Sequence, residues 1–171
     1  MARATAEIRM PGTPPGWVNG SMRVMLHTPL LQRLVGRTFA LMTVTGSRTG
    51  NTYTIPVQYL RHDGELVVLS QRMRKWWRNI TTRPAVELRI EGVTTHGKAR
   101  IASDDEALSV LAACLRDEPR VAKFYGIQPA DDGGIDPENL RGLLERVVVI
   151  VVTPQPIDVE LEPADVVMQG F

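Results

Sequence analysis

The stretch FALMTVTGSRTGNTYTIPVQYLRHDGELVVLS, residues 39–70, decides the fold class. Three runs rich in β-branched and aromatic residues, at 39–45, 52–60 and 66–70, are separated by GSRTGN and RHDGE. The glycines and polar residues of these two separators are typical of tight turns. Pro56 lies inside the second run, where its missing N–H requires a sheet edge or a bulge. The stretch therefore predicts three antiparallel strands joined in chain order.

Further strands are expected downstream. AVELRIEG (85–92) and VTTHGKARIA (93–102) predict a hairpin, and the almost continuous β-branched run ERVVVIVVTP (145–154) is typical of a strand buried on both faces. SDDEALSVLAACLRD (103–117) predicts a helix, with Ser103 and Glu106 as a capping box. Its apolar face is Leu108, Leu111 and Leu115. The order predicts a mainly β protein with some α structure, an α+β fold.

The 171 residues, 43% hydrophobic and 23% charged, are ordinary for one globular domain. Residues 1–37 are expected to form an N-terminal arm and a short helix after Thr28 and Pro29, and residues 38–171 the single main domain. No signal-peptide core or membrane-spanning run is seen, so we expect a cytoplasmic protein. The helix's apolar face is also compatible with peripheral contact to a membrane surface or to a partner chain.

Charge is divided unevenly along the chain. Residues 1–102 hold 15 Lys or Arg against 5 Asp or Glu, whereas residues 103–171 hold 5 against 14. Such a split indicates either an anion-binding face or two halves of one domain that attract each other.

The segment SQRMRKWWRNI, residues 70–80, places four cations and two of the three tryptophans at the end of an expected strand. If residues 74–80 form a helical turn or two, the cations could bind an anion and the tryptophans could wall a slot for a flat ring. Core packing is expected for one tryptophan but not for both, because adjacent helix residues point about 100° apart. Single-stranded nucleic acid would use the same residue types. It is disfavoured because the cations are confined to one short segment.

The turn GSRTGN is the second candidate site. Ser47, Arg48 and Thr49 lie between Gly46 and Gly50, and hydroxyls, backbone donors and a guanidinium together suit a phosphate or carboxylate. A plain hairpin turn is the alternative. The turn matches neither the P-loop nor the dinucleotide fingerprint.

Other chemistry has little support in the sequence. Cys114 is the only cysteine and is expected to be a small buried residue. The three histidines lack metal-ligand spacing, DDGGIDPENL is expected to be a solvated acidic loop, and no catalytic acid, base or nucleophile set is recognisable. A protein that performs redox chemistry through a bound cofactor needs none of these.

Taken together, LMTVTGSRTGNTYTIPVQYL, DGELVVLSQ, WWRNI, RPAVELRIEG and GKARI resemble the deazaflavin-dependent nitroreductase family, from about Phe39 to Ile101. The resemblance implies a six- or seven-stranded antiparallel split β-barrel with flanking helices. It also implies that the chain binds coenzyme F420, a deazaflavin with a phosphate and an acidic oligoglutamate tail.

The resemblance also assigns roles to positions. The turn would meet the phosphate or tail, one strand segment would lie along the ring, and the basic tryptophan-containing segment would close the pocket. The candidates are Ser47, Arg48 and Thr49; Ile55, Pro56 and Val57; and Ser70, Gln71, Arg72, Arg74, Lys75, Trp76, Trp77 and Asn79. Tyr125 is a regional candidate for the tyrosines that shape substrate entry in some relatives.

The implied function is hydride transfer from reduced coenzyme F420 to a planar, electron-poor acceptor such as a quinone or a nitro compound. No catalytic residue or metal ligand is assigned. The alternatives are an FMN-binding oxidoreductase of the same fold and a non-catalytic cofactor-binding protein. A homodimer is compatible with either.

Overall fold

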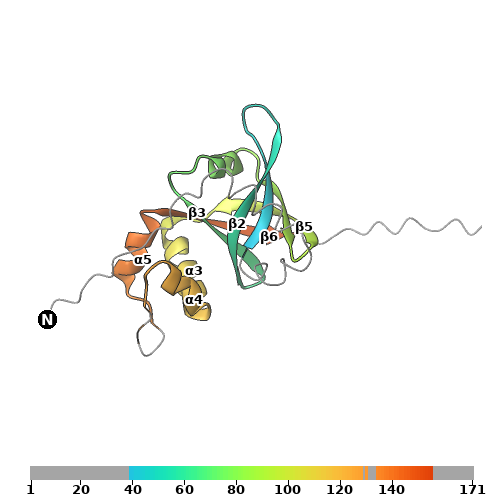
Figure 1. Cartoon of the computed structure of the whole chain (residues 1–171). Helices are drawn as coiled ribbons and strands as arrows, with labels where there is room; N and C mark the ends of the chain where they lie inside the picture. Colours follow the sequence, from blue (N-terminus) through green and yellow to red (C-terminus); the bar gives the residue numbers. More distant parts are fainter. Residues whose placement is uncertain (1–38, 129, 131–133, 156–171) are drawn as a thin grey trace, which may run out of the picture.

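A computed structural model describes residues 39–128, 130 and 134–155. Six antiparallel strands of this part close into a barrel in the order β1-β2-β3-β6-β5-β4, with helices packed on one side (Figure 1). The strands are β1 (Phe39–Thr45), β2 (Thr52–His62), β3 (Glu65–Gln71), β4 (Ala85–Ile90), β5 (Val93–Ile101) and β6 (Val147–Pro154). The expected β-barrel is confirmed, with six strands in the described residues. The arm and helix expected in residues 1–37 lie outside them.

Alternate residues of every strand point into the barrel, as the two-residue period of a strand requires. Their side chains form one buried cluster, closed at one end by Ile80 of the 3-10 helix η1 (Trp76–Thr81). The inward residues are Ala40, Met42 and Val44; Val57 and Tyr59; Leu66 and Val68; Val86, Leu88 and Ile90; Ala99; and Val148, Ile150 and Val152.

A second core lies between the barrel and the helices α3 (Asp104–Asp117), α4 (Pro119–Phe124) and α5 (Pro137–Leu144). Val147 and Val149 of β6 face this core, whereas Val148 and Ile150 face the barrel interior. Strand β6 is therefore buried on both faces, as its β-branched run predicts. Cys114 of α3 is also buried in this core, and burial raises its thiol pKa to about 11.

The helical region differs from the sequence-based expectation in three respects. Ser103 is the N-cap residue of α3, but its hydroxyl makes no capping hydrogen bond. The prediction of a complete capping box is therefore wrong. Residues 137–140, the end of the segment expected to be an acidic loop, begin α5, where Asp136 accepts the backbone N–H of Glu138 at 2.9 Å. Helix α4 was not expected either. None of the helices in the described ranges combines the length and apolarity that crossing a membrane takes.

Strands β2 and β3 diverge halfway along β2. Residues 52–58 pair with β1, but only residues 58–62 pair with β3. Beyond Leu69, β3 continues along β6 alone. In the described part of the chain, residues 52–57 therefore have a strand neighbour on one side only. Pro56 lies in this half, so the sheet edge that it requires is present.

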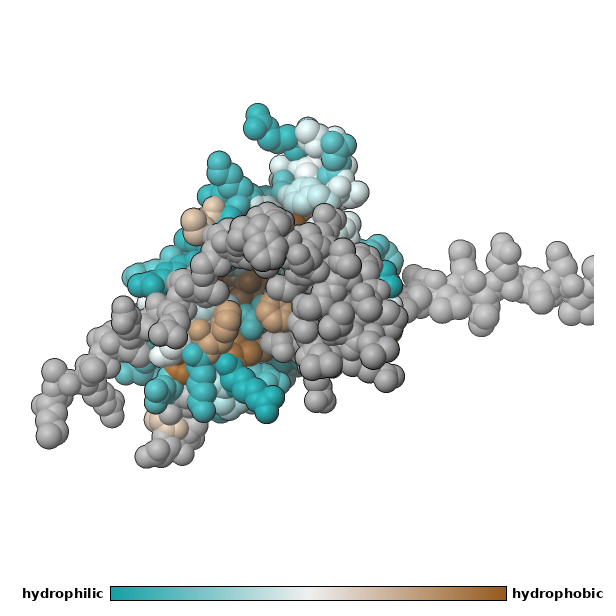
Figure 2. Space-filling view, viewed as in Figure 1, coloured by the Kyte–Doolittle hydropathy of each residue, from teal (hydrophilic) through white to brown (hydrophobic). Residues whose placement is uncertain are grey.

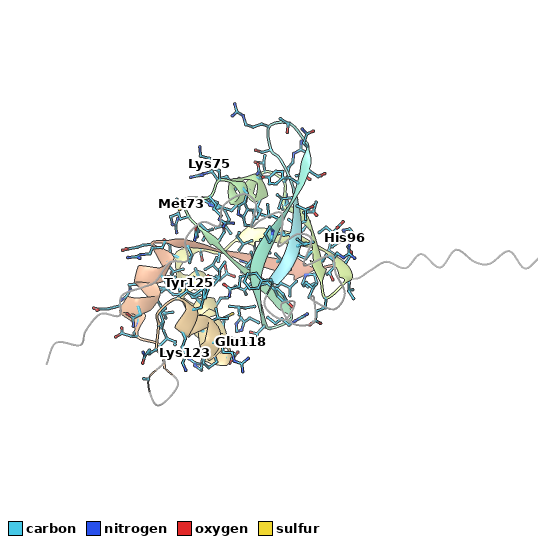
Figure 3. All side chains as sticks on the ribbon, viewed as in Figure 1. Met73, Lys75, His96, Glu118, Lys123 and Tyr125 are labelled. Atoms are coloured by element: carbon cyan, nitrogen blue, oxygen red, sulfur yellow. The ribbon has the colours of Figure 1, made fainter. Side chains whose placement is uncertain are left out.

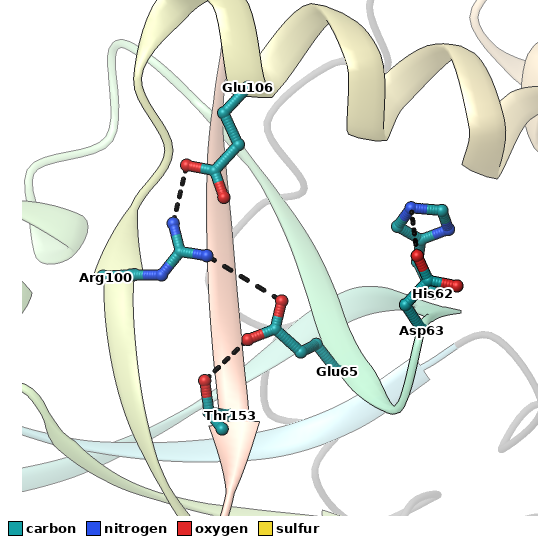
Figure 4. A network of polar contacts seen from close by, with 6 residues as sticks. All are labelled: His62, Asp63, Glu65, Arg100, Glu106 and Thr153. Atoms are coloured by element: carbon teal, nitrogen blue, oxygen red, sulfur yellow. Dashed lines mark hydrogen bonds and ion pairs between the residues drawn. The ribbon is translucent and has the colours of Figure 1, made fainter.

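A polar network ties α3 to the barrel on the outside of β3, β5 and β6 (Figure 4). Arg100 donates to Glu106 at 2.6 Å and lies 3.8 Å from Glu65, which accepts the hydroxyl of Thr153 at 2.7 Å. The hydrogen bond from Arg100 holds the pKa of Glu106 below its ordinary value.

Replacing Arg100 by methionine should lower the free energy of unfolding at pH 7 by less than about 1 kcal/mol, since both partners are partly exposed. A carboxylate with a lowered pKa stabilises the fold above its unfolded pKa of about 4.5 and loses this effect as pH falls through the folded value. Urea unfolding at pH 7 and pH 3.5 should show the difference from the parent shrinking at the lower pH. Arg116→Met is the matched control on α3, and an unchanged difference would contradict the assignment.

Candidate functional site

The β1–β2 turn is a tight, exposed loop at the tip of a hairpin that projects from the barrel. The Gly46 N–H donates to the Asn51 carbonyl at 2.8 Å, and the Gly50 N–H donates to the Gly46 carbonyl at 3.0 Å. Gly50 has a φ of 74°, which favours glycine there. Figure 2 shows hydrophilic surface over this projection, while hydrophobic surface gathers nearer the middle of the same face. Ser47, Arg48 and Thr49 are all exposed.

Helix η1 packs against β1 and β5 and brings the second candidate segment next to the turn. The Asn79 side chain accepts the N–H of Ser47 at 2.9 Å and donates to the hydroxyl of Tyr53. Burial raises the pKa of Tyr53, so its hydroxyl is protonated at neutral pH. The structure thus brings together the β1–β2 turn and the segment of residues 70–80 that contains Trp76 and Asn79.

Both tryptophans of η1 contact the barrel core, which corrects the expectation that only one does so. Trp76 and Trp77 are partly buried against the interior cluster, next to Tyr53 and Ile55. Trp77 also donates its Nε1–H to the Arg72 carbonyl at 3.3 Å, and the guanidinium of Arg78 lies 4.6 Å from its ring centroid. Both rings are only partly buried, so each packs against the edge of the core although adjacent side chains of a 3-10 helix point about 120° apart.

The cations of the β1–β2 turn and of residues 70–80 differ in their contacts. Arg72 donates its Nη2–H to the carbonyls of Leu144 and Val147, at 2.9 and 3.2 Å, and so binds the C-terminal end of α5. Arg48, Arg74 and Lys75 pair with no carboxylate in the described residues. Lys75 lies beside η1 and points away from the barrel (Figure 3). Arg72 therefore has a structural role in this structure and Arg78 stacks on Trp77, whereas Arg48, Arg74 and Lys75 remain for an anionic ligand.

The remaining candidates lie along the divergence of β2 and β3. Ile55, Pro56 and Val57 occupy the half of β2 that has one strand neighbour. Across from them, Ser70 is buried and Gln71 is half-buried, paired with Val148 and Val147 of β6. Alternate N–H and C=O groups of an unpaired strand edge point outward and can bind a ligand. The three predicted segments thus border one open edge of the sheet.

Two features of this region were not anticipated. Tyr53 is held by Asn79 across 26 residues, and nothing in the local sequence signals such a contact. A cavity of about 580 Å³ lies between η1, β6 and the helices, lined among others by Trp77, Leu108, Arg141 and Leu144. Arg141 and Leu144 belong to α5. Because α5 was not predicted from the sequence, this side of the cavity could not be predicted either. A signal for α5 was available in Asp136 followed by Pro137.

Tyr125, the regional candidate for substrate entry, is buried. Its hydroxyl donates to Gln58 Oε1 at 3.0 Å, and burial raises its pKa to about 12. It therefore ties the segment after α4 to β2 where β2 and β3 begin to diverge. Among the described residues, no group of three or more His, Cys, Asp or Glu side chains could hold a metal ion.

The described residues form a six-stranded split barrel with one open strand edge, bordered by exposed Arg48 and Lys75 and half-buried Arg74, none of which pairs with a carboxylate of these residues. This combination is a candidate site for an anionic cofactor. The family model described as F420H(2)-dependent quinone reductase matches residues 21–124, more than half of the chain. The chain therefore belongs to the F420H2-dependent quinone reductase family. It is an F420H2-dependent reductase, and coenzyme F420 is its cofactor.

Two solved structures are similar to this chain at low sequence identity. A structure of F420-H2 dependent reductase (FDR-A) is 16% identical, with a TM-score of 0.46, over 67% of this chain and 94% of the other. HutZ, the heme storage protein from Vibrio cholerae, is 12% identical, with a TM-score of 0.47, over 80% of this chain and 89% of the other.

Proposed function

We propose that this protein transfers a hydride from reduced coenzyme F420 to a quinone in the cytoplasm, with residues 38–171 as the single coenzyme-binding domain. The open edge of β2 at residues 52–57, beside Arg48, Arg74 and Lys75, carries the proposal. A nitro compound of similar shape would be a secondary acceptor.

The residues at this edge fit the coenzyme. An acidic tail and a phosphate need cations that are not already paired with a carboxylate, and Arg48, Arg74 and Lys75 of the candidate segments have no such partner in the described residues. A flat ring with polar edges needs backbone donors and acceptors beside apolar surface. The edge from Ile55 to Val57 and the rings of Trp76 and Trp77 offer both.

In this proposal the bound coenzyme supplies the hydride, and the protein supplies position and electrostatics. Arg48, Arg74 and Lys75 neutralise the anionic part. The backbone of Ile55–Val57 orients the ring, and Trp76 and Trp77 keep water from it. Residues 52–57 and 70–81 contain no Asp, Glu or His, so the proton that follows the hydride comes from water or from a hydroxyl of the pocket.

Coenzyme F420 should bind at least about tenfold more tightly than FMN, because three cations exceed what one phosphate needs and each exposed pair adds up to about 1 kcal/mol. Parallel titrations at one ionic strength, followed by tryptophan fluorescence, measure both affinities. Coenzyme with a shortened glutamate tail should give an intermediate value. Equal or reversed affinities would contradict the assignment. The same preparation is then tested for oxidation of reduced coenzyme by a soluble quinone.

A further inference from the structure

The side chain of Asn79 joins three segments that are distant in sequence. Its Oδ1 accepts the N–H of Ser47 at 2.9 Å, from a residue 32 positions away. Its Nδ2 donates to the carbonyl of Trp76 at 2.9 Å and to the hydroxyl of Tyr53. One carboxamide therefore connects η1, the β1–β2 turn and β2.

The partners fix the orientation of this carboxamide. The Ser47 N–H can only donate and the Trp76 carbonyl can only accept, so Oδ1 must face the turn and Nδ2 must face η1. Both Nδ2 hydrogens are then used, by Trp76 and Tyr53. No donor of Asn79 remains for a phosphate or a carboxylate, and its Oδ1 repels an anion. Asn79 is thus not an anion ligand, although the resemblance assigns it to the coenzyme site.

The tip of the turn depends on this contact for its attachment to the rest of the barrel. The main-chain bonds of Gly46, Gly50 and Asn51 close the turn upon itself. The bond from Ser47 to Asn79 connects the tip to a segment outside the hairpin. Arg48 follows Ser47 directly and is exposed, so its direction is set by the backbone that Asn79 holds.

We propose that Asn79 is a positioning residue, which holds the β1–β2 turn so that Arg48 meets the anionic part of the coenzyme from a fixed direction. The inference rests on the proposed function, since it needs an anion at Arg48. An arginine on a fixed turn loses less conformational entropy on binding than one on a mobile turn. The smaller entropy loss gives a higher affinity. The contribution of Asn79 therefore exists only while Arg48 is present.

A double-mutant cycle on coenzyme F420 affinity tests this dependence. Asn79→Ser should weaken binding about fivefold and Tyr53→Phe about threefold, each less than the loss from Arg48→Ala. Adding Arg48→Ala to Asn79→Ser should cost much less than Arg48→Ala costs in the parent. Lys75 lies outside the β1–β2 turn, at the start of η1. The effect of Lys75→Ala on affinity should therefore be the same in the parent and in Asn79→Ser. At saturating coenzyme, kcat should change by less than about twofold while the KM for coenzyme rises.

Asn51→Ala is the matched control, because Asn51 contributes to the turn through its main chain. If Asn79→Ser does not fold, as judged by circular dichroism, Tyr53→Phe carries the same cycle. Additive losses for Asn79 and Arg48, or parental affinity in both Asn79→Ser and Tyr53→Phe, would overturn the inference. A parent protein that does not bind coenzyme F420 would overturn the proposed function, and this inference with it, before any variant is made.

Discussion

Replacing Arg48 by alanine should weaken coenzyme F420 binding by about tenfold or more, the largest loss expected from any single cation of this chain. Arg48 is exposed on a turn held from both sides, by its own main-chain bonds and by Asn79. A hydrogen bond to a charged group contributes about 1.5 to 3 kcal/mol, and about 1.4 kcal/mol is one decade of affinity. Fluorescence titration of parent and variant measures the loss.

Arg74 and Lys75 provide the comparison, because screened surface charges contribute about 0 to 1 kcal/mol. Alanine at either position should cost less than at Arg48, and the effect should fade as the Debye length falls to about 3 Å near 1 M salt. Shortening the glutamate tail should remove the effects of Arg74 and Lys75 and leave that of Arg48. Arg116→Ala, on α3, is the charge-matched control. If Arg48→Ala binds like the parent at every salt concentration, Arg48 does not contact the coenzyme.

Replacing Gly97 by alanine should destabilise the barrel by about 3 kcal/mol, at the upper end of the cost of overpacking. Gly97 is buried in β5 against β6, where a Cβ atom would lie 2.7 Å from the Thr153 carbonyl oxygen and 2.9 Å from a methyl of Val152. The closer contact is with backbone, so no side-chain rotation can relieve it. Strands β5 and β6 must separate, which weakens their pairing.

Thermal unfolding should show this loss as a fall in Tm of roughly 6 to 12 °C, given about 2 to 4 °C per kcal/mol for a chain of this size. Lys98→Ala is the matched control, because Lys98 is the exposed neighbour on the same strand. It should unfold close to the parent. If Gly97→Ala has the Tm of the parent, the backbone of β6 does not approach Gly97 closely enough for a Cβ atom to clash with the Thr153 carbonyl oxygen.

The strands were predictable because they are runs rich in β-branched and aromatic residues, separated by turns that carry glycine and polar residues. Burial on both faces of β6 also followed from its β-branched run. Helices α4 and α5 were missed because each is short and begins with a proline, at Pro119 and Pro137, which can be read equally well as a loop signal. Helix α4 packs on α3, and α5 packs on α3 and β6, and these contacts between distant segments cannot be read from local sequence.

The candidate site could be predicted as a set of segments but not as a set of contacts. In the sequence, Arg72 cannot be distinguished from Arg48, Arg74 and Lys75 as a possible anion ligand. In the structure its guanidinium binds carbonyls at the end of α5 and the start of β6. These contacts join residues more than 70 positions apart, so the sequence could not reveal them. The same holds for Asn79, which a motif places at the site but whose hydrogen bonds are directed to the protein itself.

The two buried faces of β6 leave its alignment ambiguous. If β6 shifted by one residue against β3 and β5, each position from Val147 to Val152 would still meet an apolar core, because every residue of the run is valine or isoleucine. Hydrophobic pattern, which selects the pairing of most half-buried strands, cannot do so here. The choice falls to the two ends of the run. At one end the Thr153 hydroxyl meets Glu65 and Gly97 lies against the backbone of β6, and at the other Arg72 binds the Val147 carbonyl. These few contacts separate the native barrel from a mispaired one of nearly equal hydrophobicity.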